Sequence, residues 1–145
     1  MHMRNEIVVS APPQRIYEHA AATERWPQIL PHYRFVHVLS GDADSRTVEM
    51  AASARFEKLG MTIPVRWRAQ QVNDPITPRI SFRHVSGWTK GMLVHWEFET
   101  DGEQTRVTIH HELRSPLAPF IGKFFIDPIA TRTLRCMKAL AEGDR

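Results

Sequence analysis

Two histidines occupy positions where an imidazole ring is predicted to face the interior of the protein. His84 follows Phe82 in one alternating segment, and His111 follows Ile109 in another. Because side chains two residues apart share one face of a strand, both rings are expected to point inward. An imidazole has an ordinary pKa near 6.5, so each ring is either a general acid or base or a hydrogen-bonded core residue. Both alternatives stay open.

The remaining reactive residue types do not form a catalytic or metal-binding motif. Eight histidines are present, but His110 and His111 are adjacent on a predicted strand and point to opposite faces. The sequence has no helical His-x-x-x-His and no cysteine pair, so no metal site and no cofactor are predicted. Cys136, the single cysteine, is expected to be a packed helix residue rather than a nucleophile.

Composition is that of an ordinary globular chain, and we expect one domain over residues 1–145. The 19 Lys and Arg are scattered among 16 Asp and Glu, so a nucleic-acid partner is not expected despite the net charge of +3. No apolar run reaches the length of a membrane span and the N-terminal residues have no apolar core, which predicts no transmembrane segment and a cytoplasmic location. A monomer and a homodimer are both compatible with the sequence.

Hydrophobic periodicity predicts the elements that position these side chains. A first strand is expected at residues 5–10, followed by a helix from Pro13 and a short helix over 23–29. Period-two alternation then predicts six strands: 33–39, 46–56, 61–72, 79–85, 90–99 and 106–113. Helical spacing of apolar residues returns over 116–126 and 127–142. The order β-α-α-β6-α predicts an α+β fold whose antiparallel sheet is covered on one face by the last helix.

Several short motifs resemble a known family. The segments IVVSAPPQRIY and WPQILPHY, the strand pattern G-x-L-x-H-W-E-F and the closing helix are similar to START-like helix-grip (SRPBCC) proteins, within them the polyketide cyclase/dehydrase and coenzyme Q-binding group. The resemblance covers essentially the whole chain. It implies a curved seven-stranded sheet wrapped on the long C-terminal helix, with a hydrophobic cavity between them. Members of this family cyclise poly-β-ketones, bind quinones or lipids, or interact with macromolecules, so the fold alone does not select a function.

The resemblance implies that Trp26, Tyr33 and Trp67 line the cavity. A Tyr or Trp in a cavity wall can bury its ring and still offer a hydrogen bond to a ligand oxygen. Related aromatase/cyclases have an arginine four residues after the strand Trp, where this chain has Gln71. An amide carries no charge to stabilise an enolate, so the chain departs from the family pattern at the residue that polarises the substrate.

Three functions remain as alternatives. The first is binding of a polyketide, isoprenoid quinone or lipid without a cofactor. The second is a polyketide cyclase, aromatase or dehydratase in which Tyr33 and His84 transfer protons and Arg83 stabilises an enolate. The third is a macromolecular interaction module with a vestigial cavity. The residues expected to line the ligand site are Trp26, Tyr33, Trp67, Gln71, Phe82, His84, Trp96, Phe120 and Phe124.

The segment before Asp127-Pro128 is expected to lie over the mouth of that cavity. It contains Phe120 and Phe124, and the Asp-Pro pair resembles a helix cap followed by a first-position proline. The proline marks either a joint at which the segment moves or a fixed kink.

Overall fold

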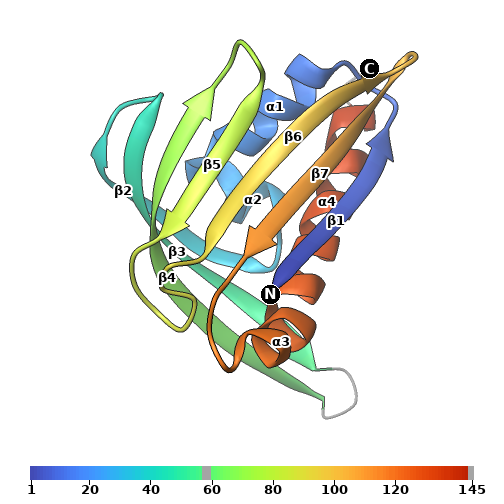
Figure 1. Cartoon of the computed structure of the whole chain (residues 1–145). Coiled ribbons are helices and arrows are strands. Elements are labelled where there is room, and N and C mark those ends of the chain that lie inside the picture. The colour runs from blue at the N-terminus through green and yellow to red at the C-terminus, as the bar shows by residue number, and fades with distance from the viewer. Residues whose placement is uncertain (57–59, 144–145) are drawn as a thin grey trace.

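The computed structural model describes residues 1–56 and 60–143, and within them seven strands form one antiparallel sheet (Figure 1). The strand order across the sheet is β1-β7-β6-β5-β4-β3-β2, so every neighbouring pair except β1 and β7 is consecutive in sequence. The strands are β1 (His2–Val9), β2 (Tyr33–Gly41), β3 (Ser45–Phe56), β4 (Met61–Asp74), β5 (Arg79–His84), β6 (Leu93–Asp101) and β7 (Gln104–Glu112).

Helices cover the concave face of the sheet, which curves around the C-terminal helix in Figure 1. The helical segments are α1 (Pro13–Ala21), η1 (Thr23–Arg25), α2 (Trp26–Ile29), α3 (Ala118–Ile121), η3 (Gly122–Ile126) and α4 (Asp127–Gly143). Helix α1 packs against β5, β6 and α4, and α4 packs against β1 and β3. The predicted helix-grip arrangement, with two short helices after the first strand and a long C-terminal helix, is confirmed.

Tight turns set the register of the hairpins. Gly41 ends β2 with a φ of +99°, and a Cβ there would collide with the carbonyl oxygen of Ser45. Only glycine is compatible with this close approach. Within the same turn the Asp42 carboxylate accepts hydrogen bonds from the backbone N–H groups of Asp44 and Ser45. A second tight turn, at Gly102 with a φ of +65°, joins β6 and β7.

Alternation places one face of β4 to β7 against the helices. On β4 the alternate residues Trp67, Ala69 and Gln71 are buried, while Ile63 and Val65 near the start of that strand are half-buried. Strand β2 departs from strict alternation because its register with β3 shifts between Tyr33 and Phe35. This irregularity lets Tyr33 and Val36, three positions apart, both be buried.

The C-terminal helical segments are continuous, which corrects the predicted cap at Asp127. Asp127 has helical dihedral angles, with φ −60° and ψ −49°, and joins η3 directly to α4. The π-helical turn of η3 comes immediately before Pro128, whose missing N–H cannot complete an α-helical ladder. Asp127 instead accepts a hydrogen bond of 2.8 Å from the Asn5 amide of β1. Across residues 1–56 and 60–143, no helix combines the length and apolarity needed to cross a lipid bilayer.

Candidate functional site

A cavity of about 80 Å³ lies between the concave face of the sheet and the C-terminal helical segments. Its wall receives side chains from α2, from β2 to β7, from the loop between β5 and β6, and from η3 and α4. Apolar and aromatic side chains form most of this wall. Its polar members are Tyr33, His84, Thr89, His111 and Thr133.

The structure places six of the predicted ligand-site residues on this wall: Trp26, Tyr33, Trp67, Phe82, His84 and Trp96. Trp26 is the centre of an aromatic cluster, with ring centroids 4.9 Å from Tyr33, 5.8 Å from Trp96 and 6.2 Å from Phe82. These separations are those of favourable edge and tilted contacts between aromatic rings. The cluster gives one end of the cavity rigid, flat walls.

Gln71 is buried but lies outside the cavity wall, because its amide is used within the protein. Its Oε1 accepts hydrogen bonds from Thr23 Oγ1 at 2.7 Å and from Arg46 Nε at 3.3 Å. Its Nε2 donates to the Ala21 carbonyl at 2.9 Å and to Asn73 Oδ1 at 2.8 Å. Arg46 also pairs with Glu24 of η1 at 2.6 Å. Gln71 therefore ties the end of α1 and η1 to the sheet.

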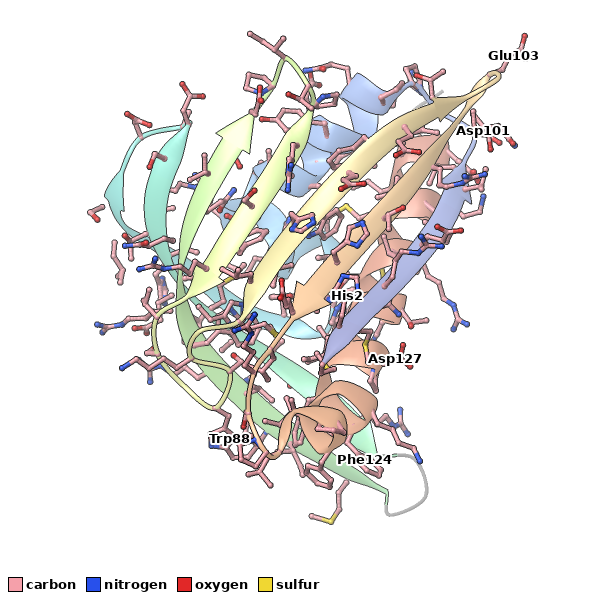
Figure 2. All side chains as sticks on the ribbon, in the orientation of Figure 1. His2, Trp88, Asp101, Glu103, Phe124 and Asp127 are labelled. Atoms are coloured by element: carbon pink, nitrogen blue, oxygen red, sulfur yellow. The ribbon has the colours of Figure 1, made fainter. Side chains whose placement is uncertain are left out.

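Phe120 and Phe124 also lie outside the wall, and Phe125 and Ile126 of η3 line the cavity instead. Phe120 is exposed, and its ring contacts Phe124 at 4.8 Å. Trp88, in the loop between β5 and β6, contacts Phe125 edge-on at 5.3 Å. Figure 2 shows Trp88 and Phe124 at the end of the molecule that α3 occupies. The predicted segment does contribute to the cavity wall, but through residues that the sequence pattern did not single out.

Arg83 is exposed, because it alternates with the buried Phe82 and His84 on β5. Arg66 and Arg68 of β4 also face outward, where both pair with Glu49. Among the described residues, no arginine and no acidic side chain lines the cavity. The wall therefore has no fixed charge to stabilise an enolate.

Three nitrogen atoms of wall residues are buried without a hydrogen-bond partner: Trp26 Nε1, Trp67 Nε1 and His111 Nδ1. Buried polar groups are nearly always paired in folded proteins, since an unpaired one costs about 1–3 kcal/mol. The indole nitrogens carry a hydrogen and can only donate. An oxygen-bearing ligand or water inside the cavity would satisfy them.

The wall histidines are held neutral. Burial lowers the pKa of His84 to about 3, with a further contribution from the neighbouring His111. Burial likewise lowers the pKa of His111 to about 4. His84 Nδ1 is hydrogen-bonded to Thr89 Oγ1 at 2.6 Å. Burial also raises the pKa of the Tyr33 hydroxyl well above its ordinary value, partly offset by a hydrogen bond with Thr133.

Helix α4 contributes polar contacts that the sequence analysis missed. Thr133, on the apolar stripe of that helix, lines the cavity and is hydrogen-bonded to His32 Nε2 at 2.8 Å. Burial, with the nearby charge of Arg132, lowers the pKa of His32 to about 4. His32 precedes β2 and lies outside any alternating pattern, so periodicity offers no signal for its burial.

Comparison with known proteins places the chain among polyketide-modifying relatives. It is 27% identical over 144 residues to the granaticin polyketide synthase bifunctional cyclase/dehydratase of Streptomyces violaceoruber, covering 94% of this chain but only 42% of that protein. The solved Zhui aromatase/cyclase of Streptomyces sp. R1128 superposes with a TM-score of 0.83 at 18% identity, over 98% of this chain and 93% of that one. A START superfamily protein from Mycobacterium smegmatis gives a TM-score of 0.73 at 13% identity, over 99% of both chains.

These two structural likenesses establish the fold, since both identities are low. The sequence family is established separately. A family model described as polyketide cyclase/dehydrase and lipid transport matches residues 9–139, and the chain therefore belongs to that family of START-like helix-grip proteins.

Proposed function

We propose that the protein binds a hydrophobic small molecule with at least one carbonyl or hydroxyl oxygen in the cavity between the sheet and α4. The observation that supports this most strongly is the pair of unpartnered indole N–H groups of Trp26 and Trp67 in a mostly apolar wall. Ligand sites are typically built from apolar walls with a few placed polar groups. A ligand oxygen could accept a hydrogen bond from an indole that has no partner within the protein.

The shape of the wall favours a flat ring over a saturated chain. Trp26, Phe82 and Trp96 present aromatic surfaces from three different elements. Planar rings gain stacking and edge contacts that an alkyl chain does not make. A cyclic aromatic ketone or a quinone head group therefore suits the site better than a fatty acyl chain.

The cavity volume limits the size of what fits without movement. At about 80 Å³ it is well below the roughly 300–1,000 Å³ of pockets for drug-sized ligands. Even a single-ring ketone requires some movement of the wall, since a cavity that binds benzene measures about 150 Å³, and a multi-ring polyketide or an isoprenoid quinone requires the wall to open further. Phe125 and Ile126 of η3 are the side chains whose displacement would enlarge the cavity toward solvent.

Catalysis of polyketide cyclisation or dehydration is the second candidate, favoured by the similarity to the granaticin cyclase/dehydratase. The polar groups of the wall support it less well than they support binding. A general acid or base works best with a pKa near the working pH, and burial moves the pKa values of His84 and Tyr33 away from neutrality in opposite directions. Arg83 lies on the opposite face of β5 and contributes no charge to the wall.

Filling the cavity provides the test. Ala130 of α4 lines the cavity and Ala139 of the same helix is exposed, so Ala130→Leu and Ala139→Leu add the same atoms in different places. We expect acetophenone, titrated calorimetrically, to bind wild type and Ala139→Leu with one site and to lose measurable binding in Ala130→Leu. Equal affinity in all three proteins, each shown to be folded by circular dichroism, would contradict the proposal.

A further inference from the structure

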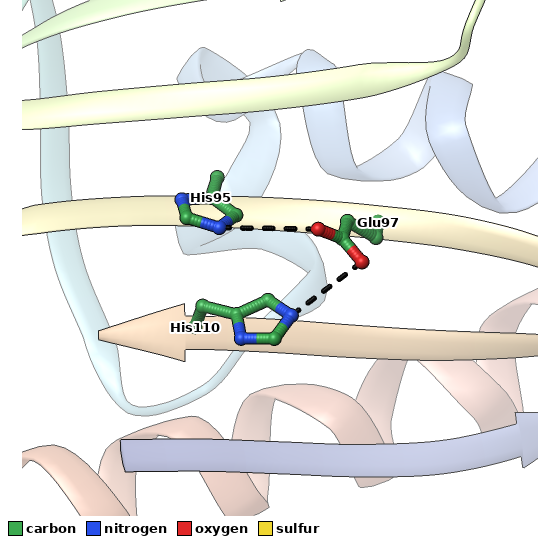
Figure 3. A group of neighbouring side chains, drawn as sticks. All are labelled: His95, Glu97 and His110. Atoms are coloured by element: carbon green, nitrogen blue, oxygen red, sulfur yellow. Dashed lines mark ion pairs between the residues drawn. The ribbon is translucent and has the colours of Figure 1, made fainter. Parts of the chain in front are cut away.

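A compact group of metal-ligating side chains lies on the outer face of the sheet, away from the cavity. His95 and Glu97 of β6 lie beside His110 of β7, and one ligand atom from each residue lies within 4.8 Å of those of the other two (Figure 3). Glu97 Oε1 is 3.9 Å from His95 Nε2, and Glu97 Oε2 is 3.5 Å from His110 Nε2. The carboxylate therefore faces the edges of both imidazoles.

Strand geometry explains why these residues meet. His95 and Glu97 are two positions apart, so both project from the same face of β6. His110 is the register partner of His95 across the antiparallel pair, and directly opposed side chains have Cβ atoms about 4.5–5.5 Å apart. The two rings stack, with centroids 4.8 Å apart and 27° between their planes. No short sequence motif reveals this group, because its members come from two strands.

We propose that His95, Glu97 and His110 bind one divalent transition-metal ion, with zinc as the reference ion. Two imidazole nitrogens and one carboxylate oxygen form a common donor set for zinc, in which the fourth position is left to water or an external ligand. Bonds of about 2.0–2.2 Å in tetrahedral geometry place ligand atoms roughly 3.3–3.5 Å apart. The observed separations of 3.5 and 3.9 Å run to the two different oxygens of Glu97, so the carboxylate and the two stacked rings must rotate to bring one atom of each residue onto a common ion.

The three residues are partly buried, and charged side chains of both signs lie near them. The side chains of His95, Glu97 and His110 are 30%, 36% and 17% exposed, so an ion can enter from solvent. Arg4 on β1 is opposite His110 but is paired with Glu6 at 3.7 Å. Arg79 on β5 is opposite Glu97 and opposes cation binding.

A bound ion would link β6 to β7, and the inner faces of both strands contribute to the cavity wall. Trp96 lies between His95 and Glu97 in sequence and points to the cavity, as do Ile109 and His111 on either side of His110. An ion that binds the folded protein but not the unfolded chain stabilises the folded state by mass action. We therefore expect zinc to raise the unfolding temperature of the protein whether or not the cavity binds a ligand.

The test is calorimetric titration of the protein, prepared without a polyhistidine tag, with ZnCl2. We expect one zinc ion per chain, and a dissociation constant at least about tenfold higher in each of His95→Ala, Glu97→Gln and His110→Asn. His37→Ala is the matched control, since His37 is an exposed histidine on β2, and it should bind zinc as wild type does. Cobalt(II) in place of zinc should give the strong visible absorption of a four-coordinate ion in wild type and lose it in Glu97→Gln.

Two results would overturn the proposal. One is the absence of saturable zinc binding by the wild-type protein. The other is binding that the three substitutions leave unchanged, or that His37→Ala weakens as much as they do, because either pattern places the ion elsewhere. Circular dichroism of each variant separates loss of the site from loss of the fold, and the partly exposed positions of the substituted residues on the outer face favour retention of the fold.

Discussion

The indole of Trp67 on β4 lies flat against the imidazole of His84 on β5, with ring centroids 5.5 Å apart and 5° between the ring planes. On its other side His84 is fixed by the hydrogen bond to Thr89. The imidazole is thus held as a neutral element of the cavity wall, between a stacked ring and a hydroxyl. This arrangement has consequences for stability as well as for binding.

Stability should depend on pH through the buried histidines. The pKa of His84 is lowered to about 3 in the folded protein, against about 6.5 in the unfolded chain, so only the unfolded chain gains its proton between these values. The stabilisation is complete above pH 6.5 and is lost as the pH falls, on the order of 3 kcal/mol at pH 4 for this residue. Urea unfolding from pH 7.5 to 4 should show a smaller decline for His84→Gln than for wild type. An exposed control, His37→Gln, should follow the wild-type curve, and an identical decline in all three proteins would refute the assignment.

Gln71 should act on stability rather than on ligand affinity. Its four hydrogen bonds join Thr23, Arg46, Asn73 and the Ala21 carbonyl, so Gln71→Ala leaves buried groups unpaired. We expect a loss of about 2–3 kcal/mol in the free energy of unfolding. The neighbouring exposed Gln70 provides the comparison, since Gln70→Ala should change stability by less than about 0.5 kcal/mol. A folded Gln71→Ala protein with unchanged stability and weakened acetophenone binding would instead assign Gln71 to the ligand.

Trp88 should control the rate of ligand exchange. It is 65% exposed and contacts Phe125 edge-on at the end of the cavity that η3 closes. Trp88→Ala removes that contact, so stopped-flow mixing should give faster association and faster dissociation with little change in the equilibrium constant. Ile76→Ala, in the exposed turn between β4 and β5, should leave both rates unchanged. Rates unaffected by Trp88→Ala would mean that ligand enters elsewhere.

Arg83 should be dispensable for binding. Its side chain is on the solvent face of β5, so Arg83→Ala should leave the calorimetric affinity for acetophenone within about twofold of wild type, as expected for a surface substitution. A tenfold loss would show that the arginine reaches the ligand and would strengthen the cyclase alternative.

Sequence periodicity sufficed for the sheet, whereas Trp26, Tyr33 and Trp67 of the cavity wall were expected from the family resemblance. Alternation identifies the inward faces of β4 to β7, because each strand is buried on one side only. It correctly predicts that His84 and His111 face the interior. Alternation does not predict which inward-facing residues line the cavity. Gln71 is an example, because its hydrogen-bond partners Thr23 and Arg46 lie on η1 and β3, and the sequence of β4 alone gives no sign of them.

Irregular backbone accounts for the errors near the end of the cavity. The prediction that Phe120 and Phe124 lie at the cavity mouth assumes an ordinary helix that ends at a cap. In the structure the π-helical turn of η3 continues into α4, and Phe125 faces the cavity instead. The group of His95, Glu97 and His110 was missed for a different reason. It depends on the register of two strands, which sequence spacing along one strand does not contain.

The central claim is that the indoles of Trp26 and Trp67 donate to an oxygen of a ligand bound in the cavity. Two-dimensional ¹H–¹⁵N spectra resolve the indole N–H of each of the four tryptophans, and Trp→Phe variants assign them. On addition of acetophenone we predict downfield shifts of the Trp26 or Trp67 indole proton, with that of the exposed Trp88 unmoved. The isosteric hydrocarbon α-methylstyrene should bind without the downfield shift. Shifts confined to Trp88, or the same shifts with both compounds, would contradict the account.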